Sequence, residues 1–342
     1  MLTILMNTEL KPGNYKSLIK DIGKILEEGR NNAFRAVNEI LVKTYWEIGK
    51  SIITFEQQGK ERAEYGSYLL ERLSKDLKSK YGKGFSRRNI VSIRLLYKTY
   101  PIRQTLSAQL SWSHYVGLLS IEEDLERSFY EQQCLNENWS VRELRRQINS
   151  ALFYRLALSK NKKEVLKLSK KGQLIEKAED LIKDPYVFEF LDIPEDYPYS
   201  ERELEQKLIN NLQYFLLELG KGFTFVARQF RISLGNEHFY VDLVFYHRIL
   251  KCFVLIDLKI EDIKPADIGQ MNMYLNYFKA EEKSKEDNEP IGIILSTRKD
   301  KIKVNYALGG ISNKLFTSKY RFYLPNKKEL ENKLRKFIIS QN

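Results

Sequence analysis

The sequence predicts an α-helical N-terminal domain followed by a mixed β-sheet flanked by helices. From Asn14 to about Arg155, apolar residues recur at three- and four-residue steps, which is the period of helices. After residue 200, short apolar runs typical of strands alternate with helical patterns. With 342 residues and 43% hydrophobic residues, the chain is long enough for two domains and a sizeable core.

The net charge of +12 is concentrated in two zones of the chain. Residues 72–103 hold ten Lys and Arg against one acidic residue, and residues 301–342 hold ten against two. Because Lys and Arg that neutralise phosphates release condensed counterions, such zones favour binding to a polyanion. Solvated helix faces produce the same composition, and this second interpretation stays open.

A pair of helices joined by glycines lies in the first basic zone. One amphipathic helix ends at the segment YGKGFS, and the next begins after Ser86, a good N-cap residue. This is the shape of a helix-turn-helix, whose second helix offers its first turn to the major groove of DNA. We expect DNA contacts from the polar side chains of this segment, namely Lys80, Lys83, Arg87, Arg88, Asn89 and Arg94. Plain packing of two helices is the alternative.

The composition also excludes several classes of protein. No apolar run approaches the roughly 18 residues that a membrane span needs, and the start MLTILM lacks the basic flank of a secretory signal. Cys134 and Cys252 lie far apart without metal-ligand spacing, which fits a reducing compartment. Three histidines exclude a histidine-rich metal site. We expect a cytoplasmic protein that does not bind a membrane.

The middle of the chain predicts a linker. Residues after 160 are polar and rich in lysine, and the segment DIPEDYPYS carries two prolines. We therefore expect a helical, DNA-binding domain at residues 1–160, a linker region with a short helix at 161–199, and a second domain at 200–342.

The second domain opens with a helix over Ser200–Leu219, which a capping pattern starts and Gly220 stops. Glu205 precedes Leu208 and Ile209 by three and four positions, so its side chain borders the buried face of this helix. The elements expected after it form a mixed sheet with helices against it. They are strands at 223–232, 239–246 and 252–260, a helix at 265–278, a strand from Ile291, a small helix at Val304–Leu308, a strand from Arg321 and a basic terminal helix.

Charged residues interrupt the apolar strands at 239–246 and 252–260. Because side chains alternate along a strand, Asp257 and Lys259 point to one face, and Asp242 on the neighbouring strand can join them. Two carboxylates in one pocket repel each other, and a hard divalent cation with oxygen ligands, such as Mg²⁺, removes this repulsion. Such an ion activates water for attack on phosphate, and Lys259 would offset the developing charge. A structural ion pair at a strand end is the alternative.

Asp242 on one strand and Asp257-Leu258-Lys259 on the next resemble the motif of the PD-(D/E)XK nuclease superfamily. The segment from Gln270 to Tyr274 resembles the Q-x-x-x-Y element of its RecB-like branch. Segments over nearly the whole chain, among them YWEIGKSI, GKGFSRRN, QLSWSHY and FYVDLVFYHR, resemble bacterial nucleases of the YhcG type. The resemblance implies an N-terminal helical DNA-binding domain and a restriction-endonuclease-like sheet domain that uses Mg²⁺ or Mn²⁺.

The resemblance also implies roles for particular residues. Lys259 would be the catalytic lysine, and Gln270 with Tyr274 would position the substrate or this lysine. His247 would contact phosphate, unless it has a structural role at the strand end. The implied metal ligands are Asp242, Asp257, the carbonyl of Leu258, and Glu205.

We therefore expect a metal-dependent endonuclease that hydrolyses DNA, in defence against foreign DNA or in the processing of mobile elements. Cutting both strands of a duplex needs two active sites, so we expect a homodimer or a higher homo-oligomer. The alternative is a catalytically inactive nuclease-fold protein that binds DNA as an assembly or regulatory module. A ribonuclease is a third interpretation.

Overall fold

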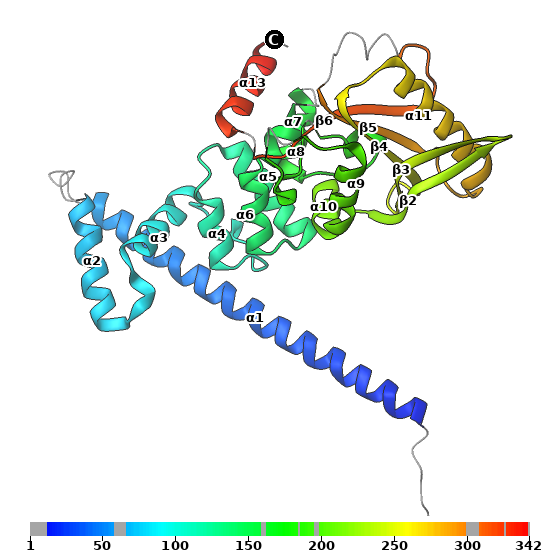
Figure 1. Ribbon diagram of the computed structural model, residues 1–342. Coiled ribbons are helices and arrows are strands. Elements are labelled where there is room, and N and C mark those ends of the chain that lie inside the picture. Colours follow the sequence, from blue (N-terminus) through cyan, green and yellow to red (C-terminus); the bar gives the residue numbers. More distant parts are fainter. Residues whose placement is uncertain are drawn as a thin grey trace, which may run out of the picture. The chain divides into compact units, whose positions relative to one another are not determined.

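A computed structural model of the chain describes residues 12–57, 66–158, 162–183, 185–194, 198–298, 308–324 and 326–340. The chain divides into two compact units, Met1–Glu122 and Glu123–Asn342 (Figure 1). The described part of the first unit is helical, and the second unit contains a β-sheet with helices. The predicted fold class, a helical region followed by a mixed sheet with helices, is confirmed.

The first unit is built on one long helix. Its α-helices are α1 (Pro12–Gln57), α2 (Gly66–Tyr81), α3 (Arg87–Thr99) and α4 (Trp112–Leu118). The C-terminal half of α1 packs closely on α3, because a Cβ atom on Gly49 would come within 2.4 Å of the carbonyl oxygen of Ile93. The indole Nε1 of Trp46 donates a hydrogen bond of 2.6 Å to the carbonyl of Tyr100 and fixes the end of α3.

The predicted helix pair is present in this unit. Helix α2 is followed by a 3₁₀ turn at Lys83–Phe85 and then by α3. Ser86 is the N-cap, and its hydroxyl accepts the backbone N–H of Asn89 at 3.3 Å. The hydroxyl of Ser74 donates to the carbonyl of Phe85 at 2.9 Å, which ties the turn back to α2.

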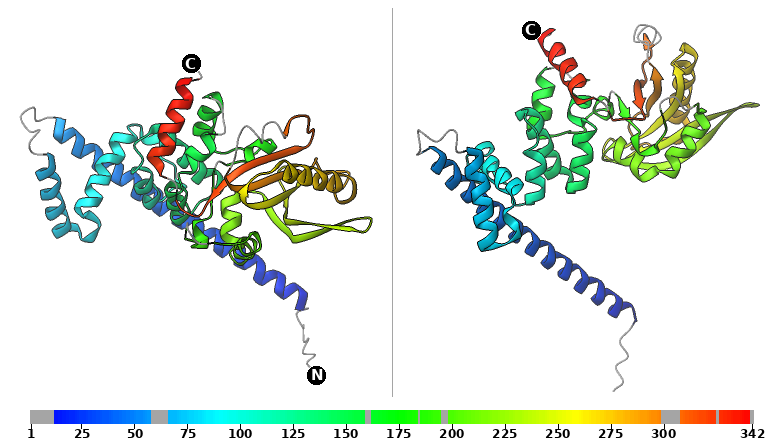
Figure 2. Two further views of the ribbon diagram at one scale, coloured as in Figure 1. Left: turned by 45° about the horizontal axis from the view of Figure 1, so that its top comes forward. Right: turned by 60° about the vertical axis from the view of Figure 1, so that its left-hand side comes forward.

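The second unit begins with helices that pack on one another. They are α5 (Asp124–Glu137), α6 (Val141–Asn149), α7 (Leu152–Ala157) and α8 (Lys162–Lys171), joined at the end of the chain by α13 (Lys327–Ser340). Ser169 of α8 donates to the carbonyl of Leu125 in α5 at 2.7 Å. Helix α13 packs against α7 (Figure 2). The ammonium of Lys327 lies 2.8 Å from the buried carboxylate of Glu126.

A six-stranded sheet of order β1-β6-β5-β4-β3-β2 forms the rest of this unit. Its strands are β1 (Tyr186–Val187), β2 (Phe223–Leu234), β3 (Glu237–His247), β4 (Cys252–Asp262), β5 (Ile291–Arg298) and β6 (Lys314–Arg321). Strands β2, β3 and β4 form the predicted antiparallel meander, whereas β4, β5 and β6 run parallel, and β1 pairs in parallel with β6.

Helices cover both faces of the sheet. Helices α9 (Glu201–Asn210) and α10 (Leu212–Leu219) share one apolar core with alternate residues of β4, such as Ile256 and Leu258. Helix α11 (Pro265–Tyr277) shares the other core with Leu255 of β4 (Figure 2). This alternation confirms that Asp257 lies on the opposite face of β4 from Ile256 and Leu258.

Residues 162–183 and 185–194 pack into the second unit, where the sequence predicted a linker. Strand β1 pairs with β6, and Tyr186 and Phe188 are fully buried in the core beside Phe215. In this segment the apolar residues stand in short groups among lysines and prolines, without the period of a helix or a strand. The sequence therefore resembled a linker. The unit boundary at Glu122 therefore lies well before the predicted domain limits at residues 160 and 199.

Two further elements differ from the expectation, and a third lies almost entirely outside the described residues. The last strand is β6 at Lys314–Arg321, not a strand beginning at Arg321, because its polar residues Thr317 and Ser318 are buried and mask the apolar pattern. The single predicted helix at Ser200–Leu219 is interrupted at Asn211, whose ψ of 29° departs from helical geometry. Except for Leu308, the small helix predicted at Val304–Leu308 lies outside the described residues.

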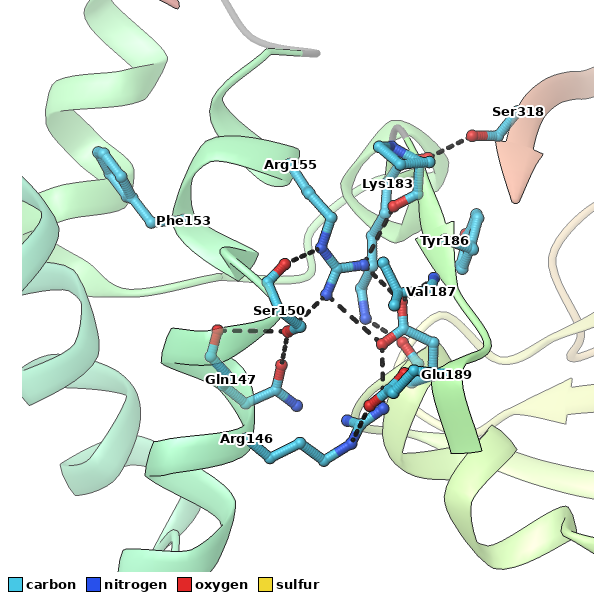
Figure 3. A network of polar contacts seen from close by, with 12 residues as sticks. Arg146, Gln147, Ser150, Phe153, Arg155, Lys183, Tyr186, Val187, Glu189 and Ser318 are labelled. Atoms are coloured by element: carbon cyan, nitrogen blue, oxygen red, sulfur yellow. Dashed lines mark hydrogen bonds and ion pairs between the residues drawn. The ribbon is translucent and has the colours of Figure 1, made fainter. Parts of the chain in front are cut away.

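A buried ionic network joins α7 to the sheet half of the second unit (Figure 3). Arg155 and Glu218 are both fully buried, with guanidinium and carboxylate 2.5 Å apart. Arg155 also donates to the carbonyls of Ser150 (2.8 Å) and Pro185 (3.0 Å), and Glu218 accepts the N–H of Val187 at 3.0 Å. Paired in this way, the two charges are compensated, and they fix α10, α7 and β1 relative to one another.

Candidate active site

The candidate site lies where two neighbouring strands part. Strands β3 and β4 pair from His247–Cys252 to Leu243–Ile256, and the next residues along them are Asp242 and Asp257. The N–H of Leu258 donates to Asp242 Oδ2 at 2.8 Å. A side-chain carboxylate therefore takes the bond that a backbone carbonyl of a paired strand would accept. The opening brings the two aspartates predicted from the sequence close enough together for the charge of Asp242 to act on Asp257.

Lys259 joins this pair from the same strand as Asp257. Its Nζ lies 2.7 Å from Asp257 Oδ2 and 3.8 Å from Glu201 Oε2. Glu201, at the start of α9, also accepts the N–H of Ile260 at 3.3 Å, which ties the helix terminus to β4. The ammonium is therefore held between a carboxylate of the sheet and one of the covering helix.

Glu205 is connected to the aspartates through Gln229. The amide Nε2 of Gln229 donates to Glu205 Oε2 at 2.5 Å and to Asp242 Oδ1 at 3.1 Å. Gln229 lies in β2 with a φ of 46°, a left-handed conformation that is uncommon for a residue other than glycine. Because such a conformation costs free energy, its presence beside two carboxylates indicates a constrained, functional position.

Gln270 and Tyr274 of α11 are bonded to each other and to the strand that carries Asp242. Gln270 donates to the hydroxyl of Tyr274, and this hydroxyl donates to the carbonyl of Tyr240 at 3.0 Å. Tyr240 precedes Asp242 by two residues on β3. The pair therefore fixes the strand that carries Asp242 and has no hydrogen bond to Lys259 among the described contacts.

Burial and mutual repulsion dominate the electrostatics of this cluster. Burial raises the pKa of Asp242, although the Leu258 N–H and Lys259 oppose the shift. Burial and the charge of Asp242 raise the pKa of Asp257 to about 7. Burial raises the pKa of Glu205 as well, against the hydrogen bond from Gln229. For Lys259, burial favours the neutral amine, but Asp257 and Glu201 outweigh it and the pKa is raised. The lysine is therefore positively charged. Its charge does not fully compensate the buried carboxyls, whose pKa values stay raised.

Two family matches together take in most of the chain. Residues 179–335 match the family described as the YhcG PDDEXK nuclease domain, and residues 21–155 match the DUF1016 N-terminal domain. A relative from Escherichia coli (strain K12), described as "Putative nuclease YhcG", is 38% identical over 94% of this chain and 93% of its own length. The chain belongs to the YhcG family.

A solved structure described as a repair endonuclease from Pyrococcus abyssi is also similar. It matches at a TM-score of 0.26 and 20% identity, over 37% of this chain and 49% of that chain. This similarity is too weak to support a conclusion about the fold or the function of this protein. The assignment to the YhcG family rests on the two family matches and the curated relative.

The chemistry of the cluster suits the divalent ion that PDDEXK nucleases use. Carboxylate and carbonyl oxygens are the ligands that Mg²⁺ prefers, and a buried pair of carboxyls with raised pKa gains from an added positive charge. Within the described ranges, no three His, Cys, Asp or Glu side chains are already arranged to hold a metal ion. Asp242 and Asp257 face each other, whereas Glu205 reaches them through Gln229. The oxygen donors of these residues suit such an ion, and of the predicted ligands Glu205 contacts the aspartates only through Gln229.

The six predicted DNA contacts of the helix pair divide into two groups. Asn89 is engaged inside the first unit, because it donates to the carbonyl of Gly84 at 2.6 Å and accepts from Trp112 at 2.8 Å. Arg94 is engaged as well, with its Nε 2.8 Å from the carboxylate of Glu56. The remaining four side chains are exposed around the turn and the start of α3: Lys80, Lys83, Arg87 and Arg88.

His247 is fully buried at the end of β3, with both ring nitrogens bonded to backbone. Nδ1 accepts the N–H of Leu250 at 3.1 Å, and Nε2 lies 2.9 Å from the carbonyl of Lys221. This environment requires the neutral ring with its proton on Nε2, and burial lowers the pKa of the imidazole. Of the two roles considered, the geometry supports the structural one.

Sequence reasoning missed Glu201 and Gln229. Glu201 stands at the first position of α9, where an acidic residue is expected for its interaction with the helix dipole alone. Gln229 lies in a strand of alternating polar and apolar residues, and a solvent-facing glutamine there is unremarkable in sequence. The position of this glutamine opposite Asp242 in the β2–β3 hairpin could have indicated its role. This pairing cannot be read from the sequence, because the register depends on a bulge between Phe225 and Ala227.

None of the described helices is both long enough and apolar enough to cross a membrane.

Proposed function

We propose that this protein is a deoxyribonuclease that uses Mg²⁺ or Mn²⁺ to hydrolyse phosphodiester bonds of DNA. The observation that carries the proposal is the meeting of Asp242 and Asp257 beside Lys259, at the point where β3 and β4 separate. Membership of a nuclease family supports the reaction class, and the excess of positive charge supports a polyanionic substrate.

Each residue of the site has a distinct part in this proposal. Asp242, Asp257 and the Leu258 carbonyl, with Glu205, would hold the ion. When bound, such an ion orients and acidifies a water molecule and offsets charge on the phosphate. Lys259, charged because of its raised pKa, would stabilise negative charge on the phosphate oxygens.

Gln229 and Glu201 would keep this arrangement in place. The amide of Gln229 holds the Glu205 and Asp242 carboxyls at a fixed separation, and Glu201 draws the Lys259 ammonium toward the helix. Gln270 and Tyr274 would position the strand that carries Asp242. These residues prevent the repelling carboxyls from turning away in the absence of substrate.

The helix pair of the first unit would bind the substrate. Lys80, Lys83, Arg87 and Arg88 are exposed around the N-terminus of α3, where basic residues oppose the helix dipole unless an anion compensates them. DNA phosphates supply such an anion. As the biological role of this cleavage, we propose defence against foreign DNA or the processing of mobile elements.

Cleavage of supercoiled plasmid, linear and branched DNA, and of RNA, with Mg²⁺ or Mn²⁺ tests the proposal. Lys259→Ala removes the ammonium of the site and should abolish cleavage. Lys264→Ala is the matched control, since this neighbouring lysine is 69% exposed and, among the described residues, its ammonium pairs with the surface residue Glu261.

Equal activity of the wild type and Lys259→Ala on every DNA would exclude catalysis at this site. DNA binding without cleavage would then favour the alternative, an inactive nuclease-fold protein that acts in assembly or regulation. Cleavage of RNA alone would assign the protein to the ribonucleases.

A further inference from the structure

The N-terminal half of α1 carries a row of exposed apolar side chains. Between residues 15 and 26, six large apolar side chains are 43–67% exposed: Tyr15, Leu18, Ile19, Ile22, Ile25 and Leu26. Val37 and Ile40 continue the row at 63% and 67%. We call the exposed apolar residues from Tyr15 to Ile40 the apolar stripe of α1. Exposed apolar area of this extent marks a site of interaction.

The apolar stripe occupies one side of the helix. At about 100° per residue, Tyr15, Ile22, Leu26 and Ile40 fall within about 40° of one another around the axis. The opposite side over the same length is charged and exposed, with lysines such as Lys24 and acids such as Glu28. The segment is therefore an amphipathic helix whose apolar side has no cover among the described residues.

The stripe does not continue the core of its own unit. Further along α1, the side that packs in the first unit carries Val42, Trp46 and Ile52, which are 2–6% exposed. Ile40 and Val42 are two positions apart, so they point in directions roughly 160° different. Ile40 is 67% exposed and Val42 is 2% exposed, which shows that the helix uses one side internally and leaves the other uncovered.

The spacing of the stripe is that of a helix which pairs with a helix of the same kind. Apolar or small residues follow steps of four and three from Tyr15 through Ile19, Ile22 and Leu26. The same steps continue through Gly29, Ala33, Ala36 and Ile40. This is the seam of a coiled coil, and the small residues at its centre let two backbones approach closely.

Area and charge favour a second copy of the chain as the partner. With its side chains about half exposed, the stripe offers on the order of 800 Å² per chain, which is what one partner contributes to a stable interface. Residues 15–40 hold five basic and four acidic side chains, so two such segments do not repel each other despite the net charge of +12.

We propose that the apolar stripe of α1 is the surface through which two copies of this protein pair. The pairing is isologous, since each copy contributes the same face. It does not depend on cleavage, and it holds for an active or an inactive nuclease site.

The test measures the mass of the full-length protein by light scattering and sedimentation over a range of concentrations. The double variant Ile22→Gln/Leu26→Gln removes two apolar side chains from the stripe without adding charge. Its matched control, Lys24→Gln/Glu28→Gln, makes the same kind of change on the charged side of the same turns. Circular dichroism checks that both variants keep their helices.

We expect the wild type and the control to have twice the mass of one chain. The stripe variant should have the mass of one chain at concentrations where the wild type is paired, with a dissociation constant raised roughly a hundredfold or more. A wild type of single-chain mass at every concentration overturns the proposal, as does a stripe variant that pairs as tightly as the control. Single-chain mass with residues 15–40 protected from hydrogen exchange would assign the stripe to another part of the same chain.

Discussion

Lys259 Nζ lies 2.7 Å from Asp257 Oδ2, although the two residues are on one strand with a single residue between them. Alternation along β4 puts both side chains on one face, and Glu201 approaches the same ammonium from α9 at 3.8 Å. The lysine is thus held at the carboxyl pair and cannot swing into solvent without losing both partners. Its position depends on a helix as well as on its own strand.

We expect Glu201→Gln to lower the cleavage rate roughly tenfold while substrate binding stays unchanged, because the lysine loses one of its two anionic partners. Steady-state kinetics that separate kcat from KM check this expectation. Glu261→Gln is the control, since Glu261 is 73% exposed and pairs with Lys264 outside the site. Equal losses in both variants would show that Glu201 does not act through Lys259.

We expect Gln229→Ala to weaken binding of Mn²⁺ roughly tenfold or more, because it releases the Glu205 and Asp242 carboxyls from their common amide. Calorimetric titration with Mn²⁺ in the absence of DNA measures this directly. Gln206→Ala is the control, because this exposed glutamine bonds Arg228 at 2.6 Å away from the carboxyls. Unchanged Mn²⁺ affinity in Gln229→Ala would remove Gln229 from the ion site.

We expect Glu218→Gln to lower the free energy of unfolding by about 3–5 kcal/mol, because it leaves the guanidinium of Arg155 buried without its counter-charge. Chemical denaturation monitored by circular dichroism gives this value. Glu329→Gln breaks the surface pair with Lys333 and should leave the unfolding free energy unchanged. A Glu218→Gln protein as stable as this control would contradict a stabilising role for the network.

We expect the contribution of His247 to the stability of the protein to decrease as the pH falls below about 6.5, the ordinary pKa of histidine. Burial lowers the pKa of this imidazole in the folded state, so the unfolded chain takes up a proton first as the pH falls. Its contribution to stability is therefore complete above about pH 6.5 and decreases below it. The unfolding free energy of the wild type minus that of His247→Asn should therefore decrease as the pH falls from 7.5 to about 5. Parallel curves would contradict this role.

The sequence was informative where charge stands against an apolar background. Asp242, Asp257 and Lys259 were predicted from carboxylates and an ammonium inside buried strands, and the structure brings all three together. Glu205 was predicted from its phase on the helix, and it reaches the same cluster through Gln229. Period, spacing and the cost of burying charge are local properties, so they can be predicted from one chain.

What the sequence did not reveal depends on contacts distant along the chain. Gln229 meets Asp242 only because a bulge in β2 sets the register of the hairpin. Asn89 is a polar residue in a first helical turn, yet its side-chain amide is hydrogen-bonded to Trp112 and to the carbonyl of Gly84. Strand β1 has two residues and gains its stability from β6 more than a hundred positions later. No local pattern encodes such partners.

The bond from the Leu258 N–H to Asp242 has a consequence for how this family can lose activity. Replacing Lys259 leaves the carboxyl of Asp257 without its nearest counter-charge, which protonation of this carboxyl can offset, whereas replacing Asp242 leaves the Leu258 N–H without its acceptor. If the proposed cleavage of DNA depends on Lys259, relatives without this activity should have lost the lysine more often than the aspartate. In a comparison of relatives, a chain that keeps the equivalent of Asp242 but lacks the equivalent of Lys259 would be expected to fold without being catalytically active.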